Sequence, residues 1–382
     1  MSIGKVNISM RRVKKGNVFQ SPGWSTANRE QLASWIRAGA GQHLPVVFDF
    51  DNTIVCGDIG EATLAWLARE GKLPPDCLPA DLCPPLILPD GSKVTLASIA
   101  DVTEYYEAFL APSNHGAKDP APFANGYVWA VEIMQGLKLA EVVRATREVM
   151  ELSQPGRECF VEPTPGKSAY PIPFFYPEIV ELIAVLIRQR FDVWVVSASN
   201  VWSVRCAVLH GLNPLLKAQG VRAGLPLDRV IGVSTLLTDR RGGLYKDTVL
   251  MRDNPDYLAL KEPALKPFRL TRLLQYPVPT YSGKVGAIWD YLGRRPYLCA
   301  GDSPGDHAML SFSEHRLWIA RLEKPDYQQV TRKLIRHTGA SDWIIQRVLA
   351  RKAPGFLSDA AQLHERLPEL SPKVRQSLRI LG

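Results

Sequence analysis

The sequence predicts an α/β fold with three layers, in which a parallel sheet lies between two layers of helices. Three apolar segments typical of buried strands each run into polar residues and then into a helical pattern; they span residues 46–48, 191–196 and 296–301. Strands that alternate with helices form parallel sheets, because each helix returns the chain to the same edge. A domain-sized stretch between Thr53 and Tyr176 also predicts an inserted second domain, since ordinary connections are short.

The first of these strands ends in two carboxylates. Asp49 and Asp51 follow the apolar residues 46–48, and residues 58–67 then form a capped helical pattern. Side chains at alternate positions of a strand face the same way, so we expect Asp49 and Asp51 to project together from its carboxyl end, where sheets of this type bind ligands. Such a pair offers a nucleophile beside an acid/base. The alternative is a loop rich in Asp and Asn that only turns the chain.

The second and third strands bring further polar groups to the same edge. The second strand ends at Ser197-Ala198-Ser199, where Ser197 is placed to hold a phosphoryl oxygen and Ser199 is a plausible rival. The third strand ends at Asp302, and Asp306 follows four residues later at the start of a helical pattern. The three strand ends therefore contribute both carboxylates and hydroxyl groups to one edge.

A lysine completes an ordered set of motifs. Lys284 precedes the helix predicted for residues 285–292, so its ammonium can lie near the same edge, although exposure at a helix terminus is the common fate of lysine. The chain thus supplies Asp-x-Asp-x-Thr, then Ser, then Lys, then Gly-Asp-x-x-x-Asp. This order resembles the four motifs of the haloacid dehalogenase (HAD) superfamily over residues 44–57 and 175–325. The resemblance implies a Rossmann-like HAD core with a mostly helical cap inserted after the first motif.

We divide the chain accordingly. The expected parts are a basic N-terminal arm at residues 1–27, the HAD core at 28–57 and 175–350, the cap at 58–174, and a C-terminal helical extension at 351–382. Within the cap, residues 73–92 are rich in proline and predict irregular chain. Apolar residues at spacings of three and four predict helices over 97–110 and 127–152, and residues 162–173 lead back to the core.

The chemistry follows from the residue types. Phosphoryl transfer depends on charge neutralisation and positioning around an in-line nucleophile. We expect Asp49 to attack phosphorus and form an aspartyl-phosphate, while Asp51 protonates the leaving alcohol and then deprotonates the attacking water. Mg²⁺ prefers carboxylate oxygens, so Asp49 and Asp302 are its expected ligands. The resemblance adds the backbone carbonyl of Asp51 as a metal ligand and leaves Asp306 to hold a metal-bound water or Lys284. Contacts to phosphate or substrate are assigned to Thr53, Ser197, Ala198, Lys284 and Glu61.

The second aspartate and the cap indicate a substrate class. Dehalogenases of the superfamily lack a carboxylate at the position of Asp51, and the Asp-x-Asp-Asn-Thr variant resembles the phosphoserine and phosphorylcholine phosphatase branch. The cap offers aromatic residues for a pocket: Tyr105, Tyr106, Tyr127 and Trp129, with Trp66 and Glu61 near its hinge. Aromatic faces with a carboxylate suit a cationic head group such as choline or ethanolamine. The alternative, which is the usual fate of aromatic residues, is that they pack the cap's own core.

The stretch before Lys284 is longer than a compact phosphatase needs. Residues 229–244 predict a strand and a hairpin. Residues 251–279 contain many prolines and charges, and we interpret them as an elaborated loop near the mouth of the site. Arg252, Lys261 and Lys266 in this loop either meet an anionic ligand or, as is commoner, lie on a solvated surface.

Composition narrows the function classes. Nearly half of the 382 residues are hydrophobic, no apolar run is long enough to span a bilayer, and the basic segment 1–20 lacks the apolar centre of a secretory signal, so we expect a cytoplasmic enzyme. A net charge of +8 favours anionic ligands such as a small phosphorylated metabolite. Part of that charge lies in residues 332–351, where we expect helical packing against the core. The competing functions are a phosphotransferase or phosphomutase of the same fold, or a nucleic-acid-binding or surface-binding protein on a HAD scaffold, which the complete set of chemical residues makes less favourable.

Overall fold

The computed structural model describes residues 19–88, 90–110 and 125–382, and its centre is one seven-stranded sheet. The strands are β1 (Pro45–Phe48), β8 (Asp192–Asn200), β9 (Val230–Val233), β13 (Leu298–Gly301), β14 (His315–Arg321), β15 (Trp343–Leu349) and β16 (Gly355–Phe356). Their order across the sheet is β16-β15-β14-β13-β1-β8-β9, and every neighbouring pair is parallel except β15 with β16. The predicted α/β class with a parallel sheet is confirmed.

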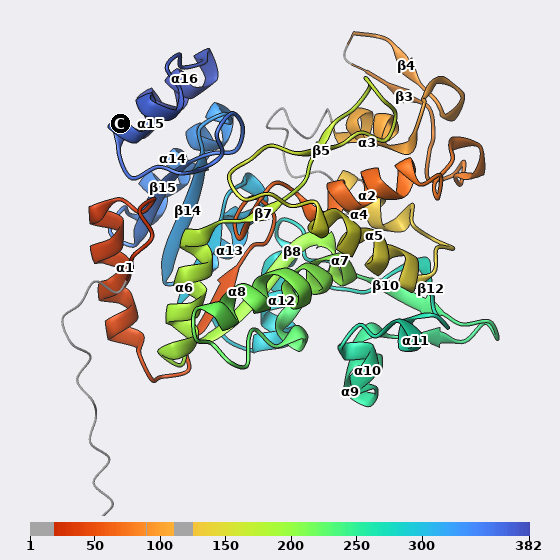
Figure 1. Ribbon diagram of the computed structural model, residues 1–382, viewed down its shortest axis with the longest axis horizontal. Helices are drawn as coiled ribbons and strands as arrows, with labels where there is room; N and C mark the ends of the chain where they lie inside the picture. The colour runs from red at the N-terminus through yellow and green to blue at the C-terminus, as the bar shows by residue number, and fades with distance from the viewer. Residues whose placement is uncertain (1–18, 89, 111–124) are drawn as a thin grey trace, which may run out of the picture.

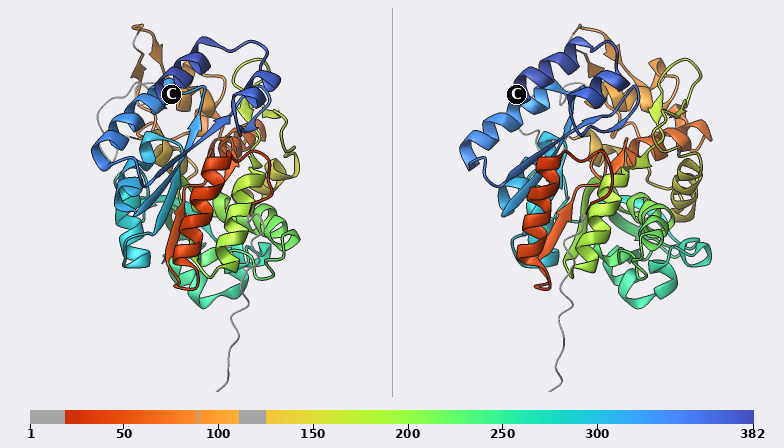
Figure 2. Two further views of the ribbon diagram at one scale, coloured as in Figure 1. Left: turned by 90° about the vertical axis from the view of Figure 1, so that its left-hand side faces the viewer. Right: turned by 60° about the vertical axis from the view of Figure 1, so that its left-hand side comes forward.

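Helices cover both faces of this sheet. The helices α1 (Thr26–Gly39) and α6 (Pro177–Arg188) lie side by side on one face, and α12 (Gly283–Leu292), α13 (His307–Phe312) and α14 (Pro325–Thr338) pack on the other (Figure 2). Side chains alternate across a strand, so Val46 and Phe48 join the hydrophobic cluster of α1 and α6, while Val47 joins the cluster of α12 and α13. The sheet is therefore buried on both sides, as its short, uniformly apolar strands predict.

Parallel pairing brings the carboxyl ends of the central strands together. Phe48, the last residue of β1, is opposite Val195 of β8 and Ala300 of β13. Gly301 is in turn opposite Trp318 of β14. The residues that follow each strand therefore reach the same edge of the sheet, at the switch point where a crevice forms.

The inserted cap is mostly helical, as predicted, but its elements are shorter. Its helices are α2 (Ile59–Arg69), α3 (Val102–Leu110), α4 (Gly126–Glu132) and α5 (Leu139–Glu151), with short strands β3 (Leu86–Ile87), β4 (Lys93–Val94), β5 (Phe160–Val161) and β6 (Tyr170–Pro171) and 3₁₀ turns at Pro75–Cys77 and Leu96–Ser98. The helix predicted over 127–152 is interrupted because Gly136 adopts a φ of +83°. The two chain crossings between core and cap pair as an antiparallel ribbon of β2 (Val55–Cys56) and β7 (Phe174–Phe175).

The expectation of a loop over residues 251–279 is wrong. A second sheet of three strands, β10 (Thr235–Thr238), β11 (Leu244–Tyr245) and β12 (Arg269–Leu274), follows β9, and it carries the helices α9 (Asp247–Asp253), α10 (Pro255–Leu258) and α11 (Glu262–Leu265). Two of the prolines that indicated a loop, Pro255 and Pro263, stand in the first turns of α10 and α11, where proline is tolerated. The predicted strand and hairpin over 229–244 are confirmed by β9, β10 and β11.

This second insert touches the cap directly. The amide of Gly136 donates to the carbonyl of Leu270, and the amide of Leu270 donates to the carbonyl of Leu137. The amide of Leu139, at the start of α5, donates to the carbonyl of Phe268. Figure 1 shows β12 and α11 beneath α5, beside the cap. The cap is thus joined to the rest of the chain at the β2–β7 ribbon and at β12, and its helix α5 also contacts α7 (Val201–Ala207), where the Thr146 hydroxyl donates to the Ser203 hydroxyl.

Both ends of the described chain differ from expectation. Helical packing over 343–349 is wrong, because this segment forms β15 inside the sheet, where its alternate aliphatic residues are buried on both faces. The C-terminal extension holds β16 as well as its helices α15 (Ala360–Arg366) and α16 (Pro372–Leu381). Most of the predicted basic arm, residues 1–18, lies outside the described residues, but Phe19 and Trp24 are buried, and Trp24 packs edge-on against Phe356.

The remaining helical turns follow β8 and precede β9. They are α7 (Val201–Ala207), a π-helical turn at Val208–Leu212, α8 (Asn213–Ala218) and a 3₁₀ turn at Leu227–Arg229. One further 3₁₀ turn, at Pro304–Asp306, lies between β13 and α13.

Among the described residues, no helix combines the length and apolar character needed to cross a bilayer. All six cysteines are free thiols, in agreement with the absence of any paired Cys spacing in the sequence.

A buried ion pair joins the second insert to the core. Asp247, the first residue of α9, accepts hydrogen bonds from Arg205 at 2.9 Å, from the Trp202 indole at 3.0 Å and from the Tyr257 hydroxyl at 2.7 Å. The side chains of Asp247 and Arg205 are each 3% exposed. Removing one partner of such a pair leaves an uncompensated buried charge, which is costly.

We expect Asp247→Ala to lower the free energy of unfolding by about 3–5 kcal/mol, because the Arg205 guanidinium loses its counter-ion in the interior. Asp253→Ala in the same helix is the matched control: its pair with Arg252 is exposed, so the loss should be at most about 1 kcal/mol. Equilibrium urea unfolding measures both. Equal losses for the two variants would contradict a structural role for the Arg205–Asp247 pair.

Candidate active site

Lys284 holds two carboxylates at the centre of the edge. Its ammonium lies 2.6 Å from Oδ1 of Asp49, which follows β1, and 2.6 Å from Oδ1 of Asp306, which precedes α13. The lysine side chain is 3% exposed. Gly283 begins α12 at a point where a Cβ would meet the Val278 carbonyl at 1.9 Å, so the close turn before Lys284 requires glycine. The lysine is therefore a buried cation shared between two acids, and not an exposed helix-terminal residue.

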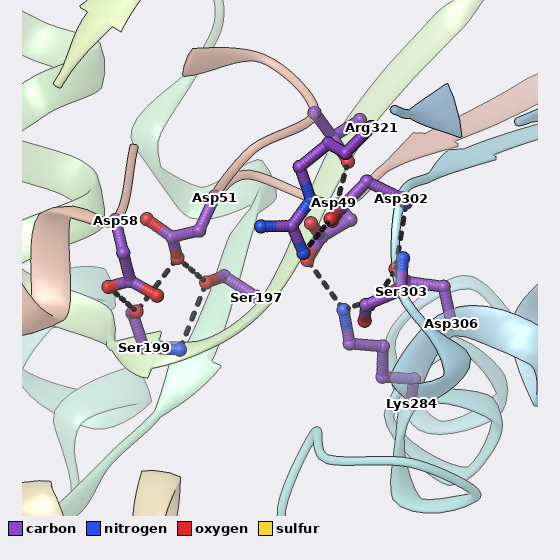
Figure 3. Close-up of polar contacts among 11 residues, drawn as sticks. Asp49, Asp51, Asp58, Ser197, Ser199, Lys284, Asp302, Ser303, Asp306 and Arg321 are labelled. Atoms are coloured by element: carbon purple, nitrogen blue, oxygen red, sulfur yellow. Dashed lines mark hydrogen bonds and ion pairs between the residues drawn. The ribbon is translucent and has the colours of Figure 1, made fainter. Parts of the chain in front are cut away.

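Asp306 also organises the loop after β13. Its Oδ2 accepts from the amides of Asp302 and Ser303, both at 3.0 Å. These bonds fix the direction of the Asp302 side chain. Asp302 accepts a 3.4 Å bond from the Thr53 hydroxyl on Oδ1, and its Oδ2 forms an ion pair at 2.5 Å with Nη2 of Arg321, the last residue of β14. Figure 3 shows Lys284, Asp49, Asp302 and Arg321 converging from four separate elements.

Asp51 faces a different set of partners. Its carboxylate accepts from the Ser199 hydroxyl at 2.7 Å, from the Ser197 hydroxyl at 3.1 Å and from the amide of Ile59 at 2.7 Å. The expectation that Asp49 and Asp51 project together like strand neighbours is wrong in detail, because β1 ends at Phe48 and both acids lie in the loop beyond it. The two carboxylates line one cavity, yet they contact different partners, Asp51 the two serines and Asp49 the lysine (Figure 3).

Burial and mutual repulsion raise the pKa of these acids. The pKa of Asp49 is well above its usual range, chiefly through burial and then through the charge of Asp306, while Lys284 opposes the shift. Burial and the charge of Asp58 raise the pKa of Asp51 to about 7. Burial also raises the pKa of Asp302 to about 7, although Arg321 lowers it. The site therefore contains more negative charge than its own cations neutralise.

The acids line a narrow cavity of about 60 Å³. Its lining includes Asp49, Asp51, Asp58, Asp302, Lys284, Arg321, Ala198, Ser199, Tyr127, Thr280 and Tyr281. A smaller cavity of about 10 Å³ adjoins it and shares Asp58, Tyr127, Ala198 and Ser199. The chamber thus lies between the carboxyl edge of the sheet and the cap helices α2 and α4.

The predicted residues divide into those at the cavity and those behind it. Asp49, Asp51, Ala198, Lys284 and Asp302 line the larger cavity, and Glu61 lines the smaller one, where its Oε1 accepts a 3.2 Å bond from Tyr106. Thr53 and Ser197 are fully buried behind the wall, and their hydroxyls donate to Asp302 and Asp51. Of the two rival serines, Ser199 is the one that lines the cavity.

The aromatic residues of the cap also divide. Tyr105 donates to the Pro84 carbonyl and stacks on Trp129 at 5.2 Å between ring centroids, and Trp129 donates to the Leu82 carbonyl. Trp66 donates to Glu148 on α5. These three pack the cap, as the alternative interpretation proposed. Tyr106 and Tyr127 do line the cavities, and they leave the aromatic-pocket hypothesis standing only for these two.

Two residues at the cavity were not singled out by the sequence. In the sequence, Asp58 is only the first residue of the capped helical pattern, and it does cap α2 by accepting a hydrogen bond from the Glu61 amide. Its carboxyl group also lines both cavities. Arg321 ends β14, and its position next to β13 would have indicated the same edge once β14 was recognised as a strand. Neither Asp58 nor Arg321 is part of a sequence motif that indicates a functional site by itself.

Comparison with known proteins supports the architecture. No family model matches the chain, and no curated protein matches its sequence significantly. A conserved protein of unknown function from Anaerococcus prevotii DSM 20548 is 18% identical with a TM-score of 0.60, over 90% of this chain and 98% of that one. A protein of unknown function from Bordetella pertussis Tohama I is 13% identical with a TM-score of 0.44, over 78% and 96% of the two chains. A substrate-bound phosphoserine phosphatase is 13% identical with a TM-score of 0.36, over 72% and 85%.

Of these three, the Anaerococcus protein bears on the fold, because its score extends over nearly all of both chains. The lower scores of the other two carry no structural argument. The α/β core with its inserts is therefore an arrangement shared with a protein of unknown function, and the chemistry has to be argued from the site itself.

The acidic residues at the centre fit a divalent cation. Oxygen atoms of Asp49, Asp302 and Asp306 lie within 4.8 Å of one another, and all three side chains are buried. Oδ2 of Asp302 contacts Arg321 in an ion pair, and Oδ1 of Asp302 accepts only the long 3.4 Å bond from Thr53 among the described residues, so Oδ1 is weakly engaged. Hard cations such as Mg²⁺ take carboxylate ligands from separate segments and retain water. The donors present therefore suit the predicted magnesium.

We expect Mg²⁺ to stabilise the folded protein, because it would neutralise acids whose pKa values are raised chiefly by burial and further by their mutual repulsion. At 100 times the dissociation constant the gain would be about 2.7 kcal/mol. Titration calorimetry and thermal unfolding measure it without any substrate. Asp302→Asn should abolish the effect, whereas Asp192→Asn, at the opposite end of the parallel strands, should leave it intact. A magnesium effect that survives Asp302→Asn would rule out this cluster as the site.

Proposed function

We propose that the protein is a magnesium-dependent phosphomonoesterase of the HAD type, which acts on a small phosphorylated metabolite through an aspartyl-phosphate. One observation carries the proposal: Asp49 lies at the carboxyl edge of the sheet, is held by Lys284 at 2.6 Å, and lines a narrow cavity with Asp302 and Asp51. A carboxylate, a cation, a cluster able to bind a metal and a second acid are the parts that phosphoryl transfer needs.

Asp49 is the proposed nucleophile. Lys284 contacts one of its oxygens, which fixes the carboxylate and balances negative charge as the phosphoryl group approaches. A divalent cation bound by Asp49 and Asp302, with the expected backbone carbonyl of Asp51, would supply positive charge next to the phosphoryl oxygens. Asp306 supports this arrangement by holding both Lys284 and the loop of Asp302.

Asp51 is the proposed acid and base. It lines the same cavity as Asp49 but bonds to Ser197 and Ser199 and not to Lys284, so we place the leaving oxygen of the substrate beside Asp51. Ser197, Ser199 and the amide of Ile59 orient its carboxyl group, so it can give a proton to the leaving oxygen and then take one from water. Because Ser199 lines the cavity and Ser197 does not, we assign the nearer substrate contact to Ser199 and a supporting role to Ser197.

The chamber supports a small substrate. Its larger cavity of about 60 Å³ is well below the roughly 300–1,000 Å³ of ordinary ligand pockets, so a bulky leaving group does not fit while the cap lies in this position. The adjoining cavity, lined by Tyr106, Tyr127, Asp58 and Glu61, has room for about one water molecule, so a compact head group would bind beside these residues only after the cap moves away from the core. Phosphocholine, phosphoethanolamine and phosphoserine remain suitable candidates, since two acids and two aromatic rings suit an ammonium group.

Asp49→Asn should reduce phosphomonoester hydrolysis by about 10³-fold or more, because the amide cannot form the covalent intermediate. Asp51→Asn should reduce the rate of phosphomonoester hydrolysis by about 10²- to 10⁴-fold, which is the size of one general acid–base contribution. Phosphate release from a panel of phosphorylated metabolites with Mg²⁺, and with EDTA, measures both.

Asp290→Asn, on the same helix as Lys284 but away from the cavity lining, serves as the control and should keep full activity. Wild-type protein that hydrolyses no member of the panel, together with an Asp49→Asn variant identical to it in every property, would overturn the phosphatase proposal.

The narrow cavity also favours a second candidate, a phosphotransferase or phosphomutase of the same fold, because restricted access of water would protect an acyl phosphate for transfer to a bound alcohol. As a hydrolase, the protein should release inorganic phosphate in a one-to-one ratio with the alcohol product when glycerol or ethanolamine is added. A phosphate yield that falls as the added alcohol is phosphorylated would favour the transferase. Chromatography of the products distinguishes the two outcomes.

A further inference from the structure

Arg321 is a cation that lines the cavity but has no role in the proposed chemistry. It ends β14, its side chain is 13% exposed, and its guanidinium lies 5.4 Å from the centre of the Tyr327 ring. Its ion pair runs from Nη2 to Oδ2 of Asp302. The Nε group has no hydrogen-bond partner among the described residues, although it is buried. A guanidinium carries five N–H donors, so most of its capacity is free for another group.

A second arginine on the same strand shows how a purely structural guanidinium is satisfied. Arg316, also buried in β14, donates to the carbonyls of Leu310, Ser313 and Glu314 and lies over Trp343. It lines none of the cavities described above. Arg321 differs in both respects, because its donors are not used by backbone carbonyls and its side chain forms part of the wall around Asp49 and Asp51. Packing of β14 alone does not explain it.

The charges around Arg321 place it between the reacting end of the cavity and the cap. On the core side it contacts Asp302, next to the proposed metal ligands. On the cap side it lines the same cavity as Asp58, the residue that caps the start of α2. Lys284 is already bound to Asp49 and Asp306. Arg321 is thus the described cation best placed to meet a group on the leaving side of a substrate.

We propose that Arg321 is a specificity-determining residue that binds a second anionic group, a carboxylate or another phosphoryl, on the substrate's leaving group. The planar guanidinium presents parallel N–H donors that match such a group in two bonds. Tyr327 supports its flat face, and Asp302 holds one of its corners. The inference rests on the proposed phosphatase function and narrows its substrates to phosphomonoesters that carry a further negative charge close to the ester oxygen.

The test compares substrates that differ by that charge alone. Phosphoserine and phosphoethanolamine differ by one carboxylate, and phosphoglycolate and ethyl phosphate differ by a carboxylate in place of a methyl group. We expect wild-type kcat/KM to be at least about 10-fold higher for the charged member of at least one pair. Arg321→Gln should lower kcat/KM for that member by about 10- to 100-fold, the value of a charge-assisted bond, and change its uncharged partner by less than about threefold. For Arg321→Lys, kcat/KM for the charged substrate should lie between the wild-type and Arg321→Gln values, because lysine keeps the positive charge but lacks the two parallel N–H donors.

Arg316→Gln is the matched control, because it perturbs the same strand at its other end and should leave the substrate ratio unchanged. If Arg321→Gln lowers kcat/KM by the same factor for both substrates of a pair, the role of Arg321 is limited to its ion pair with Asp302. That result would overturn the inference. A wild-type ratio near one in both pairs would overturn it without any variant, even where Arg321→Gln fails to fold in thermal unfolding. Activity on other monoesters would then preserve the phosphatase proposal, whereas inactivity on every monoester would remove both.

Discussion

The buried ammonium of Lys284 is the interaction on which the site depends. Asp49 and Asp306 come from segments far apart in the sequence, and both are removed from water, so their charges would repel each other without a shared cation. Burial favours a neutral amine, but Asp306 and Asp49 together raise the pKa of Lys284 and keep it charged. This one contact joins the end of β1 to the start of α13 through α12.

The second acid cluster depends on the first. Asp306 holds Lys284 with one oxygen and the loop of Asp302 with the other, so the direction of Asp302 is set by the residue that also anchors the lysine. Arg321 then balances Asp302 from the neighbouring strand. Asp51 and its two serines share no hydrogen bond with this network among the described residues, and the amide of Ile59 connects Asp51 to the first turn of α2 in the cap. The charge of Asp51 still acts on the network, because it raises the pKa of Asp49 and of Asp302.

The sequence predicts this edge because Asp49, Asp51 and Asp302 directly follow strands, and parallel pairing makes strand ends meet. These three residues line one cavity with Lys284, which comes from the first turn of α12, while their chemical roles remain proposals. The same local patterns do not tell which of the two serines lines the cavity, because both lie in β8, where the pairing with β9 becomes irregular between Val196 and Asn200. They also fail for residues 343–349, because a short aliphatic run suits a strand or a helix until its neighbours are known. Arg321 was missed for this reason, as its strand was not foreseen.

The contacts of the cap with its surroundings bear on how the cavity would exchange its contents. Movement of the cap about the β2–β7 ribbon would have to break the three backbone hydrogen bonds that join residues 136–139 to residues 268–270, each worth about 0.5–1.5 kcal/mol, and also the buried Thr146–Ser203 hydrogen bond between α5 and α7. In the proposed phosphatase, the entry of substrate and the departure of product would therefore be coupled to the stability of a small sheet that takes no part in the chemistry.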